Sequence, residues 1–202
     1  MVGLIARMHI ADGILPLEFC AAGYAGALTG AYWFGGKPNP EQISRMGLFA
    51  AAAFVASLVH FPLAGVSVHL GLWGLLGVVL GRRAFPVVFA ALLFQALFLG
   101  HGGIVSLGVN VVNMGTGALA GWGLWSISVG PAAVRAFAAG FAGAIVPAVI
   151  MALQFEAAGY GRGFFAVAAV YALVALVEGA ATASIVGFLL RSKPEILQRV
   201  TA

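Results

Sequence analysis

The chain has 202 residues, of which 62% are hydrophobic and only 8% are charged, and its formal net charge is +4. In a soluble domain about a quarter of the residues are charged and just under half are apolar. This composition therefore excludes a soluble fold and predicts an integral membrane protein. The basic residues are scattered over short loops, which argues against nucleic acid as a partner and leaves the lipid bilayer as the surrounding medium.

Residues 1–7 are too short to cross a bilayer or to supply the hydrophobic region of a signal peptide. They precede the pair Met8-His9, which begins a segment of unusual chemistry. We therefore expect residues 1–7 to be a mis-assigned or removed extension and residues 8–13 to be a metal-binding N-terminal segment. The whole of 1–202 is expected to be a single transmembrane domain.

Breaks rich in proline, glycine and charge divide the rest of the chain into seven apolar segments. We expect helices at 14–34, 46–62, 67–81, 85–100, 108–128, 132–155 and 164–190. The predicted fold class is an all-α integral membrane protein, a bundle of about seven transmembrane helices. Segment 67–81 is short, which is tolerated if part of it is re-entrant or lines a cavity.

Loop charges predict the orientation of this bundle. With seven spans, eight of the ten Lys and Arg residues fall on one side, and only Arg7 and Arg162 fall on the other. Because basic loops stay in the cytoplasm, the N-terminus is expected outside and the C-terminus inside the cytoplasmic (inner) membrane.

The four histidines all fall at the outer face in this topology. His9 precedes the first span, His60 ends the second, His69 opens the third and His101 ends the fourth. Neutral imidazole is a common ligand of transition metals, and polar groups at membrane depth usually have a task or a partner. Plainer roles stay open: His60 could sit at the headgroup level, and His101 could bond carbonyls of its glycine-rich loop.

The pair Met8-His9 has chelating chemistry if Met8 is the first residue. Its amine, the amide nitrogen of His9 and the ring of His9 can then bind one ion in a plane. A nitrogen from a helix-borne histidine would complete a square, which is the geometry of Ni(II) or Cu(II). A metal-bound amide loses its proton, so binding is expected to weaken in acid.

Other polar residues lie within apolar segments. Asn110 and Asn113 share one helix face and could bond between helices or support the metal site. Glu178 lies in the last span, where it could have a function, pair with Arg135 or contact a partner. Cys20 is the only cysteine, which excludes an intrachain disulfide and a cysteine metal cluster.

These motifs resemble the CbiM/NikM family, the substrate-capture (S) components of energy-coupling factor (ECF) transporters for cobalt and nickel. The similarity covers about residues 8–198 and is carried by Met8-His9-Ile10-Ala11-Asp12-Gly13, Gly102-Gly103-Ile104, Leu107-Gly108, Asn110, Asn113-Met114-Gly115, Leu176-Val177-Glu178-Gly179 and Lys193-Pro194-Glu195. The resemblance implies that Met8, His9 and His69 hold the metal. Supporting or gating candidates are Asp12, His101, Asn110 and Asn113, and His60 is a weaker candidate.

The chain shows no means of using ATP, since neither of its lysines, Lys37 and Lys193, lies in a phosphate-binding loop. The resemblance implies as partners a transmembrane coupling protein (T component) and two ATP-binding subunits, with a small auxiliary membrane subunit as a further candidate. We therefore interpret the chain as a Ni(II)- or Co(II)-capturing subunit of an ECF-type ABC importer, without a cofactor of its own and not an enzyme.

The planar nitrogen set favours nickel, while the resemblance allows either metal. One alternative function is an S component for an organic vitamin, which would not need Met8-His9. Another is an intramembrane metalloenzyme, although no histidine has an acid at the spacing of an H-E-x-x-H helix.

Overall fold

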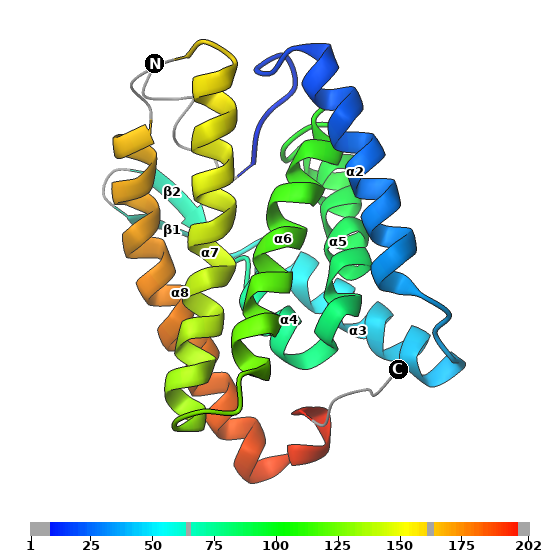
Figure 1. The fold of residues 1–202 in the computed structure, drawn as a ribbon, viewed down its shortest axis with the longest axis vertical. Helices are drawn as coiled ribbons and strands as arrows, with labels where there is room; N and C mark the ends of the chain where they lie inside the picture. Colours follow the sequence, from blue (N-terminus) through cyan, green and yellow to red (C-terminus); the bar gives the residue numbers. More distant parts are fainter. Residues whose placement is uncertain (1–8, 64–65, 161–163, 198–202) are drawn as a thin grey trace.

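A computed structural model describes residues 9–63, 66–160 and 164–197, which form a helical bundle (Figure 1). Seven α helices lie within these residues: α2 (Leu17–Gly35), α3 (Pro40–Ala56), α4 (Trp73–Leu80), α5 (Ala84–Leu99), α6 (Leu107–Ser126), α7 (Ala132–Ala157) and α8 (Phe164–Ser192). Shorter elements are β1 (His60–Leu63), β2 (Val66–His69) and the 3-10 helices η1 (Gly81–Arg83) and η2 (Pro194–Leu197). The all-α class and the order of seven helical segments are confirmed.

Three helical stretches in the described part of the chain are long and apolar enough to cross a membrane: Trp73–Leu99, Ala132–Ala157 and Ala169–Ser192. The first of these joins α4 to α5 across Gly81, whose φ of 62° and ψ of −140° interrupt the helix. The count of seven membrane spans therefore stays a prediction.

Helix α3 differs from its predicted range of 46–62. It begins at Pro40, where the Asn39 side chain accepts a hydrogen bond from the Gln42 backbone N–H (2.8 Å) and the Gln42 side chain accepts one from the Asn39 N–H (3.0 Å). These two reciprocal hydrogen bonds form a capping box, and proline is the first helical residue. Both features favour the start of a helix even though the first turn is polar. The apolar run that begins near residue 46 marked only the interior of the helix.

Residues 60–63 and 66–69 form two paired strands, whereas the predicted helices 46–62 and 67–81 extend into both of these ranges. Strands β1 and β2 pair in antiparallel register, with His60 opposite His69. Helix α4 begins only at Trp73, after Leu72 adopts the left-handed conformation at φ 52°. His60 and His69 therefore lie in strands and not at helix ends.

Helix α4 is short and central. It has 8 residues, all of them buried, and at 1.5 Å per residue it is only about 12 Å long. Added Cβ atoms at Gly74 and Gly77 would stand 2.2 Å from the Ala139 oxygen and 2.0 Å from the Ala118 oxygen. The backbone of α4 thus lies directly against α7 and α6, which is the close approach that small residues permit between membrane helices.

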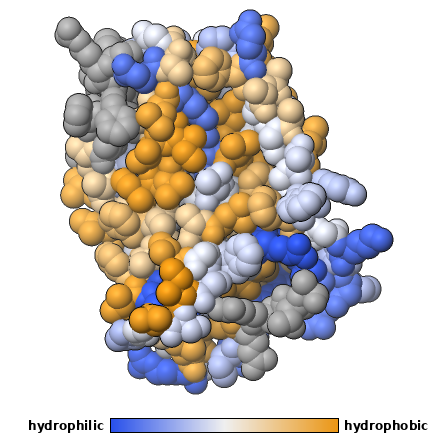
Figure 2. All heavy atoms as spheres, in the orientation of Figure 1, coloured by the Kyte–Doolittle hydropathy of each residue, from blue (hydrophilic) through white to orange (hydrophobic). Residues whose placement is uncertain are grey.

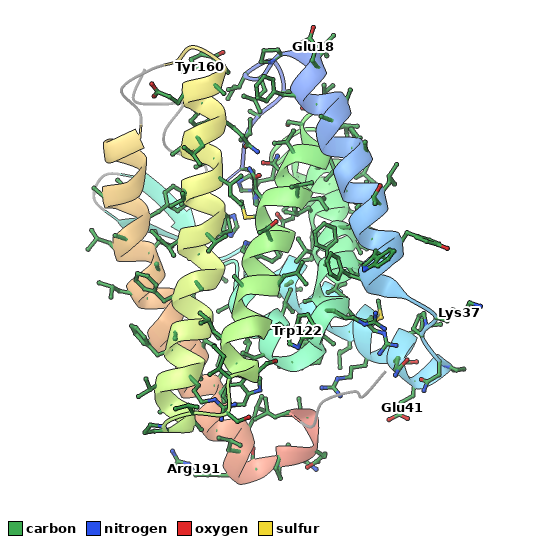
Figure 3. The ribbon with its side chains drawn as sticks, in the orientation of Figure 1. Glu18, Lys37, Glu41, Trp122, Tyr160 and Arg191 are labelled. Atoms are coloured by element: carbon green, nitrogen blue, oxygen red, sulfur yellow. The ribbon has the colours of Figure 1, made fainter. Side chains whose placement is uncertain are left out.

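Hydrophilic residues gather at the end of the bundle where α2 ends and α3 begins, and the face above this end is mainly hydrophobic (Figure 2). Lys37, Glu41 and Arg191 lie at this end, far from Glu18 and Tyr160 (Figure 3). Arg45 of α3 donates hydrogen bonds to the carbonyl oxygens of Val79 (3.0 Å) and Ile196, which ties η2 to α4.

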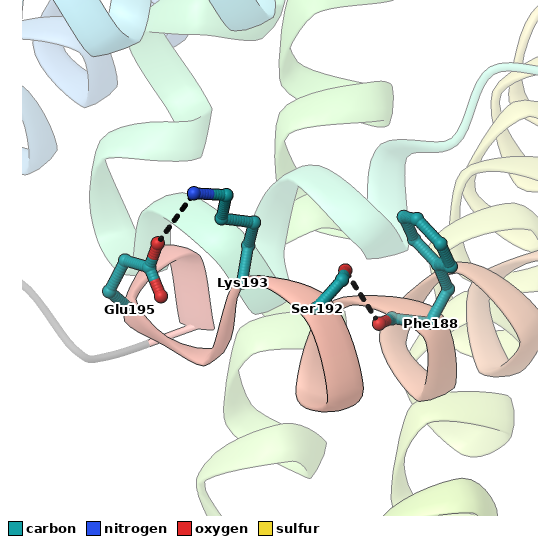
Figure 4. A network of polar contacts seen from close by, with 4 residues as sticks. All are labelled: Phe188, Ser192, Lys193 and Glu195. Carbon is teal, nitrogen blue, oxygen red and sulfur yellow. Dashed lines mark hydrogen bonds and ion pairs between the residues drawn. The ribbon is translucent and has the colours of Figure 1, made fainter.

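The junction of α8 and η2 also has local contacts (Figure 4). The Ser192 hydroxyl donates to the Phe188 carbonyl oxygen at 2.9 Å, and the ammonium of Lys193 lies 3.7 Å from the Glu195 carboxylate. Because both members of the ion pair are exposed, with 67% and 58% of their side chains accessible, it contributes little to stability. The fixed position of η2 depends on Arg45 instead.

We expect the substitution Gly77→Ala to destabilise the bundle by about 1–3 kcal/mol, because its methyl group would force α4 away from α6. Gly123→Ala is the matched control, since Gly123 lies in α6 with open space around it. Thermal unfolding in detergent, followed by circular dichroism, compares the two. Equal melting temperatures would contradict the packing described for α4.

Candidate metal centre

The segment before α2 runs from the start of that helix into the interior of the bundle (Figure 1). Ile10 is 1% exposed and packs with Val109 of α6 and Met151 of α7. The Asn110 side chain forms two hydrogen bonds with the backbone of Ile10. It accepts one from the Ile10 N–H at 2.8 Å and donates one to the Ile10 carbonyl oxygen at 2.9 Å. Asn110 therefore fixes the segment that carries His9.

Asp12 is held at the rim of this region by the loop before α6. Its carboxylate accepts hydrogen bonds from the Ser106 backbone N–H and the Ser106 hydroxyl, both at 2.8 Å. Burial acts to raise the pKa of the Asp12 carboxyl, but the hydrogen bonds from Ser106, Val105 and Ile104 outweigh it and lower the pKa. The ionised Asp12 carboxylate thus links the N-terminal segment to the loop before α6 through hydrogen bonds.

The loop itself requires glycine. Gly102 and Gly103 have φ of 83° and 84°, a region that side chains disfavour. A Cβ on Gly102 would lie 3.0 Å from the Cβ of His9, and one on Gly103 would lie 2.2 Å from the Asp12 carboxylate carbon. These two glycines let the loop close over the N-terminal segment.

Three histidines meet between these segments. The ring centres of His9 and His69 are 5.4 Å apart, those of His9 and His101 are 5.4 Å apart, and those of His69 and His101 are 5.3 Å apart. His9 is 3% exposed and His69 is 1% exposed, whereas His101 is partly exposed. We call His9, His69 and His101 the histidine cluster.

The electrostatic surroundings keep His9 neutral. Burial lowers the pKa of its imidazole well below the usual value, and the neighbouring His69 and His101 lower it further. Gln95 of α5 lies beside the ring and acts in the opposite direction, yet neither ring nitrogen of His9 has a partner of good hydrogen-bond geometry among the described residues. A neutral, desolvated imidazole has a lone pair available for a metal ion.

Glu178 of α8 positions the backbone that follows His69. Its carboxylate accepts from the Gly71 N–H at 2.6 Å and from the Leu72 N–H at 3.0 and 3.2 Å. Glu178 is 1% exposed, so its carboxyl group is buried beside the backbone N–H groups that it accepts from. Among the described residues, Glu178 forms no ion pair with Arg135, which stacks on the Trp125 ring at 4.4 Å. The burial of Glu178 also keeps its carboxyl group away from the surface of the bundle.

Not every predicted site residue joins the cluster. Met8 and the side chain of His60 lie outside what the structure describes. Asn113 exchanges two hydrogen bonds of 2.8 Å with Gln154 of α7, so it links helices. Within the described residues, no three His, Cys, Asp or Glu side chains are already placed to hold a metal ion. The cluster is therefore a group of potential ligands in ring contact, not a formed coordination sphere.

Sequence reasoning missed two residues that shape the centre. Gln95 is fully buried in α5, and its backbone oxygen accepts from the His101 N–H at 3.1 Å. Ser106 joins Asp12 to the loop, and its hydroxyl also lies 2.7 Å from the Ile10 oxygen. A lone glutamine in an apolar helix was a visible signal, whereas nothing in its neighbourhood distinguished Ser106.

The sequence matches the family model CbiM, "Cobalt uptake substrate-specific transmembrane region", over residues 9–196. The chain belongs to the CbiM family. The family assignment also makes it a multi-pass membrane protein of a cobalt and nickel transport family, in agreement with the resemblance seen in its motifs. The match begins at His9 and includes the whole histidine cluster.

Individual relatives bear names of both metals. The chain is 33% identical to a cobalt transport protein CbiM of Sorangium cellulosum, covering 96% of each chain, and 32% identical to one of Geobacter sulfurreducens, covering 99% of this chain and 64% of the relative. It is also 32% identical to a fused nickel transport protein NikMN of Rhodobacter capsulatus, covering 94% of this chain and 64% of the relative. The chain thus spans less than two thirds of two of these CbiM-family proteins.

The fold has a solved counterpart. A crystal structure of a truncated transition metal transporter superposes with a TM-score of 0.76, covering 93% of this chain and 98% of that one at 23% identity. At this identity the likeness concerns the fold alone, and it supports the helical architecture of the CbiM-family bundle.

In this CbiM-family chain, we expect Glu178→Gln to lower metal affinity by about 10–100-fold, as losses of residues that orient a ligand do. The new NH₂ group would face the Leu72 N–H, donor against donor, and loosen the backbone after His69. Equilibrium dialysis of the purified protein with Co(II) measures the change. The control is Ser184→Ala on the same helix, since that hydroxyl bonds only its own helix at Ala180. Equal affinities of the two variants would contradict this role.

Proposed function

We propose that the chain captures a divalent transition-metal ion, Ni(II) or Co(II), for uptake across the membrane. One observation carries this proposal: His9 and His69 come from segments 60 positions apart, yet both are almost fully buried with their ring centres 5.4 Å apart. Apolar side chains would pack this part of the interior better than two buried imidazoles in contact, so packing alone does not account for the pair. Their shared chemistry is metal ligation.

We propose Met8, His9 and His69 as the ligands of this ion. In a chain that begins at Met8, the amine, the His9 amide nitrogen and the His9 ring would form three corners of a square, and His69 would supply the fourth. Support comes from the fixed position of the segment, since Asn110 and Asp12 hold the residues that follow His9. Four nitrogens in a plane favour Ni(II).

Transport against a gradient needs energy that we assign to partners. We propose that the chain is the substrate-capturing S component of an ECF-type importer, with a transmembrane coupling protein and two ATP-binding subunits. The support is the membership in a family of cobalt-uptake transmembrane regions, together with relatives named for cobalt and nickel transport. In this proposal the metal is cargo, and the chain catalyses no reaction of its own.

We expect the histidine cluster to face the outside. Lys37 and Arg191 lie at one end of the bundle and Glu18 at the other (Figure 3), and basic ends stay in the cytoplasm. A reporter fused after Ala202 should therefore be cytoplasmic, and one inserted after Gly159 should be external. Paired alkaline phosphatase and green fluorescent protein fusions at each site measure this. The same location for both sites would refute the seven-span topology.

Removal of either buried imidazole should abolish capture. We expect His9→Ala and His69→Ala each to reduce labelled Ni(II) or Co(II) uptake by more than about 100-fold in cells that also express the coupling protein and ATPases, because a lost ligand costs more than a lost supporting contact. The control is Tyr32→Phe, at a side chain 84% exposed on α2.

Equilibrium dialysis of the purified chain with Ni(II), Co(II) and a panel of organic vitamins accompanies the uptake assay. Retention of a vitamin but of neither metal would overturn the proposed cargo. Normal uptake by both histidine variants would overturn the proposed site.

A further inference from the structure

We propose that the bundle binds an internal water molecule in a cavity between α4, α6, α7 and α8. The described residues that line this cavity include Trp73 of α4, Met114 of α6, Gly143 and Met151 of α7, and Tyr171 of α8. Among the described lining residues, none belongs to the histidine cluster. The site is therefore separate from the metal centre, and polar groups that the helices leave without partners define it.

Pro147 leaves an acceptor in α7 without its helical donor. In an α helix the residue at position 147 would donate to the carbonyl oxygen of Gly143, but proline has no N–H. Gly143 and Pro147 both line the cavity. A Cβ on Gly117 of α6 would lie 2.6 Å from the Gly143 oxygen, so glycine at that position leaves room beside the oxygen. In membrane helices, carbonyl groups that a proline frees are satisfied by neighbouring helices or by ordered water.

The start of α4 supplies hydrogen-bond donors at the same place. Trp73 is the first helical residue, and the side chain of Leu72 before it makes no capping hydrogen bond. The N–H groups of Trp73, Gly74 and Leu75 therefore have no partner within the helix. The Gly74 nitrogen lies 2.2 Å from the position of a Cβ on Gly143. The indole N–H of Trp73, a residue only 1% exposed, also has no hydrogen-bond partner among the described residues.

A water molecule fits this site by size and by chemistry. The cavity gives the centre of a water molecule about 10 Å³ of space, which is enough for one water. Purely apolar cavities stay dry, whereas a buried water makes about two to four hydrogen bonds to polar groups that otherwise lack partners. Here the Trp73 indole would donate to the water, and the water would donate to the Gly143 oxygen. The water would thus join the start of α4 to the proline break in α7.

Hydroxyl-radical footprinting by X-ray radiolysis tests this site, because radicals formed from a bound internal water oxidise the side chains beside it even when these are buried. In the purified full chain in detergent, Trp73 should be oxidised faster than Trp125, although Trp73 is 1% exposed and Trp125 is 8% exposed. Peptide mass spectrometry measures both rates in one sample. Slower oxidation of Trp73 than of Trp125 would mean that the cavity is dry and would overturn the proposal.

A variant that fills the cavity sharpens the test. Ala148 lines the cavity, so Ala148→Val should remove the oxidation of Trp73 and Met151. The matched control is Ala152→Val, since Ala152 lies on the same helix, is equally buried at 2% exposure and is not among the described lining residues. Melting temperatures show whether both variants fold. Equal oxidation of Trp73 in the two folded variants would contradict a bound water.

A second pair of variants serves if Ala148→Val does not fold. Trp73→Phe removes the indole N–H that would hold the water, so it should lower the oxidation of Met151, whereas Trp125→Phe should leave that oxidation unchanged. Unchanged oxidation of Met151 in Trp73→Phe would overturn the role of the indole and with it the site. Because no metal ion enters these measurements, their outcome is distinct from that of the tests of metal capture.

Discussion

The pairing of the Asn110 amide with the backbone of Ile10 is the interaction on which the centre depends. It brings an irregular segment into an apolar bundle, where an unpaired backbone group costs about 1–3 kcal/mol. The two hydrogen bonds, at 2.8 and 2.9 Å, satisfy the N–H and the C=O of one residue together. Because they fix Ile10, they also fix the adjacent His9 against His69 and His101. Without that pairing, the segment that carries His9 would lose its fixed position against α6.

His69 is held by the same principle. The backbone after it is irregular at membrane depth, which is tolerated where protein groups satisfy it, and here the Glu178 carboxylate receives the N–H groups of Gly71 and Leu72. The irregular stretch leaves only 8 residues for α4. Glycines compensate for that short length by letting α4 lie directly on α6 and α7. A side chain of a long helix thus anchors each of the two segments that carry the buried histidines, Asn110 for His9 and Glu178 for His69.

Part of the fold and of the candidate centre could be predicted from local sequence patterns. Apolar runs and their breaks gave seven helical segments in the right order, and Met8-His9 and Gly102-Gly103 pointed to the region of the centre. The strand pair of 60–63 and 66–69 was missed because its apolar composition also fits a helix, and a short apolar run does not distinguish a strand from a helix. The start of α3 was missed because the cap at Asn39 lies in a polar stretch. The role of Glu178 depends on a contact across 107 positions, which no local pattern contains.

Charge bears on how the proposed centre would bind an ion. Imidazole is a ligand without negative charge, so a bound divalent ion would add two positive charges to an apolar interior, at a large desolvation cost. Among the described residues, the buried acid is Glu178, and its carboxyl oxygens already accept hydrogen bonds from the backbone after His69. The coordinate bonds must therefore supply nearly all of the affinity. Glu178 would therefore act on the proposed site through the position of the backbone that follows His69, and not through its charge.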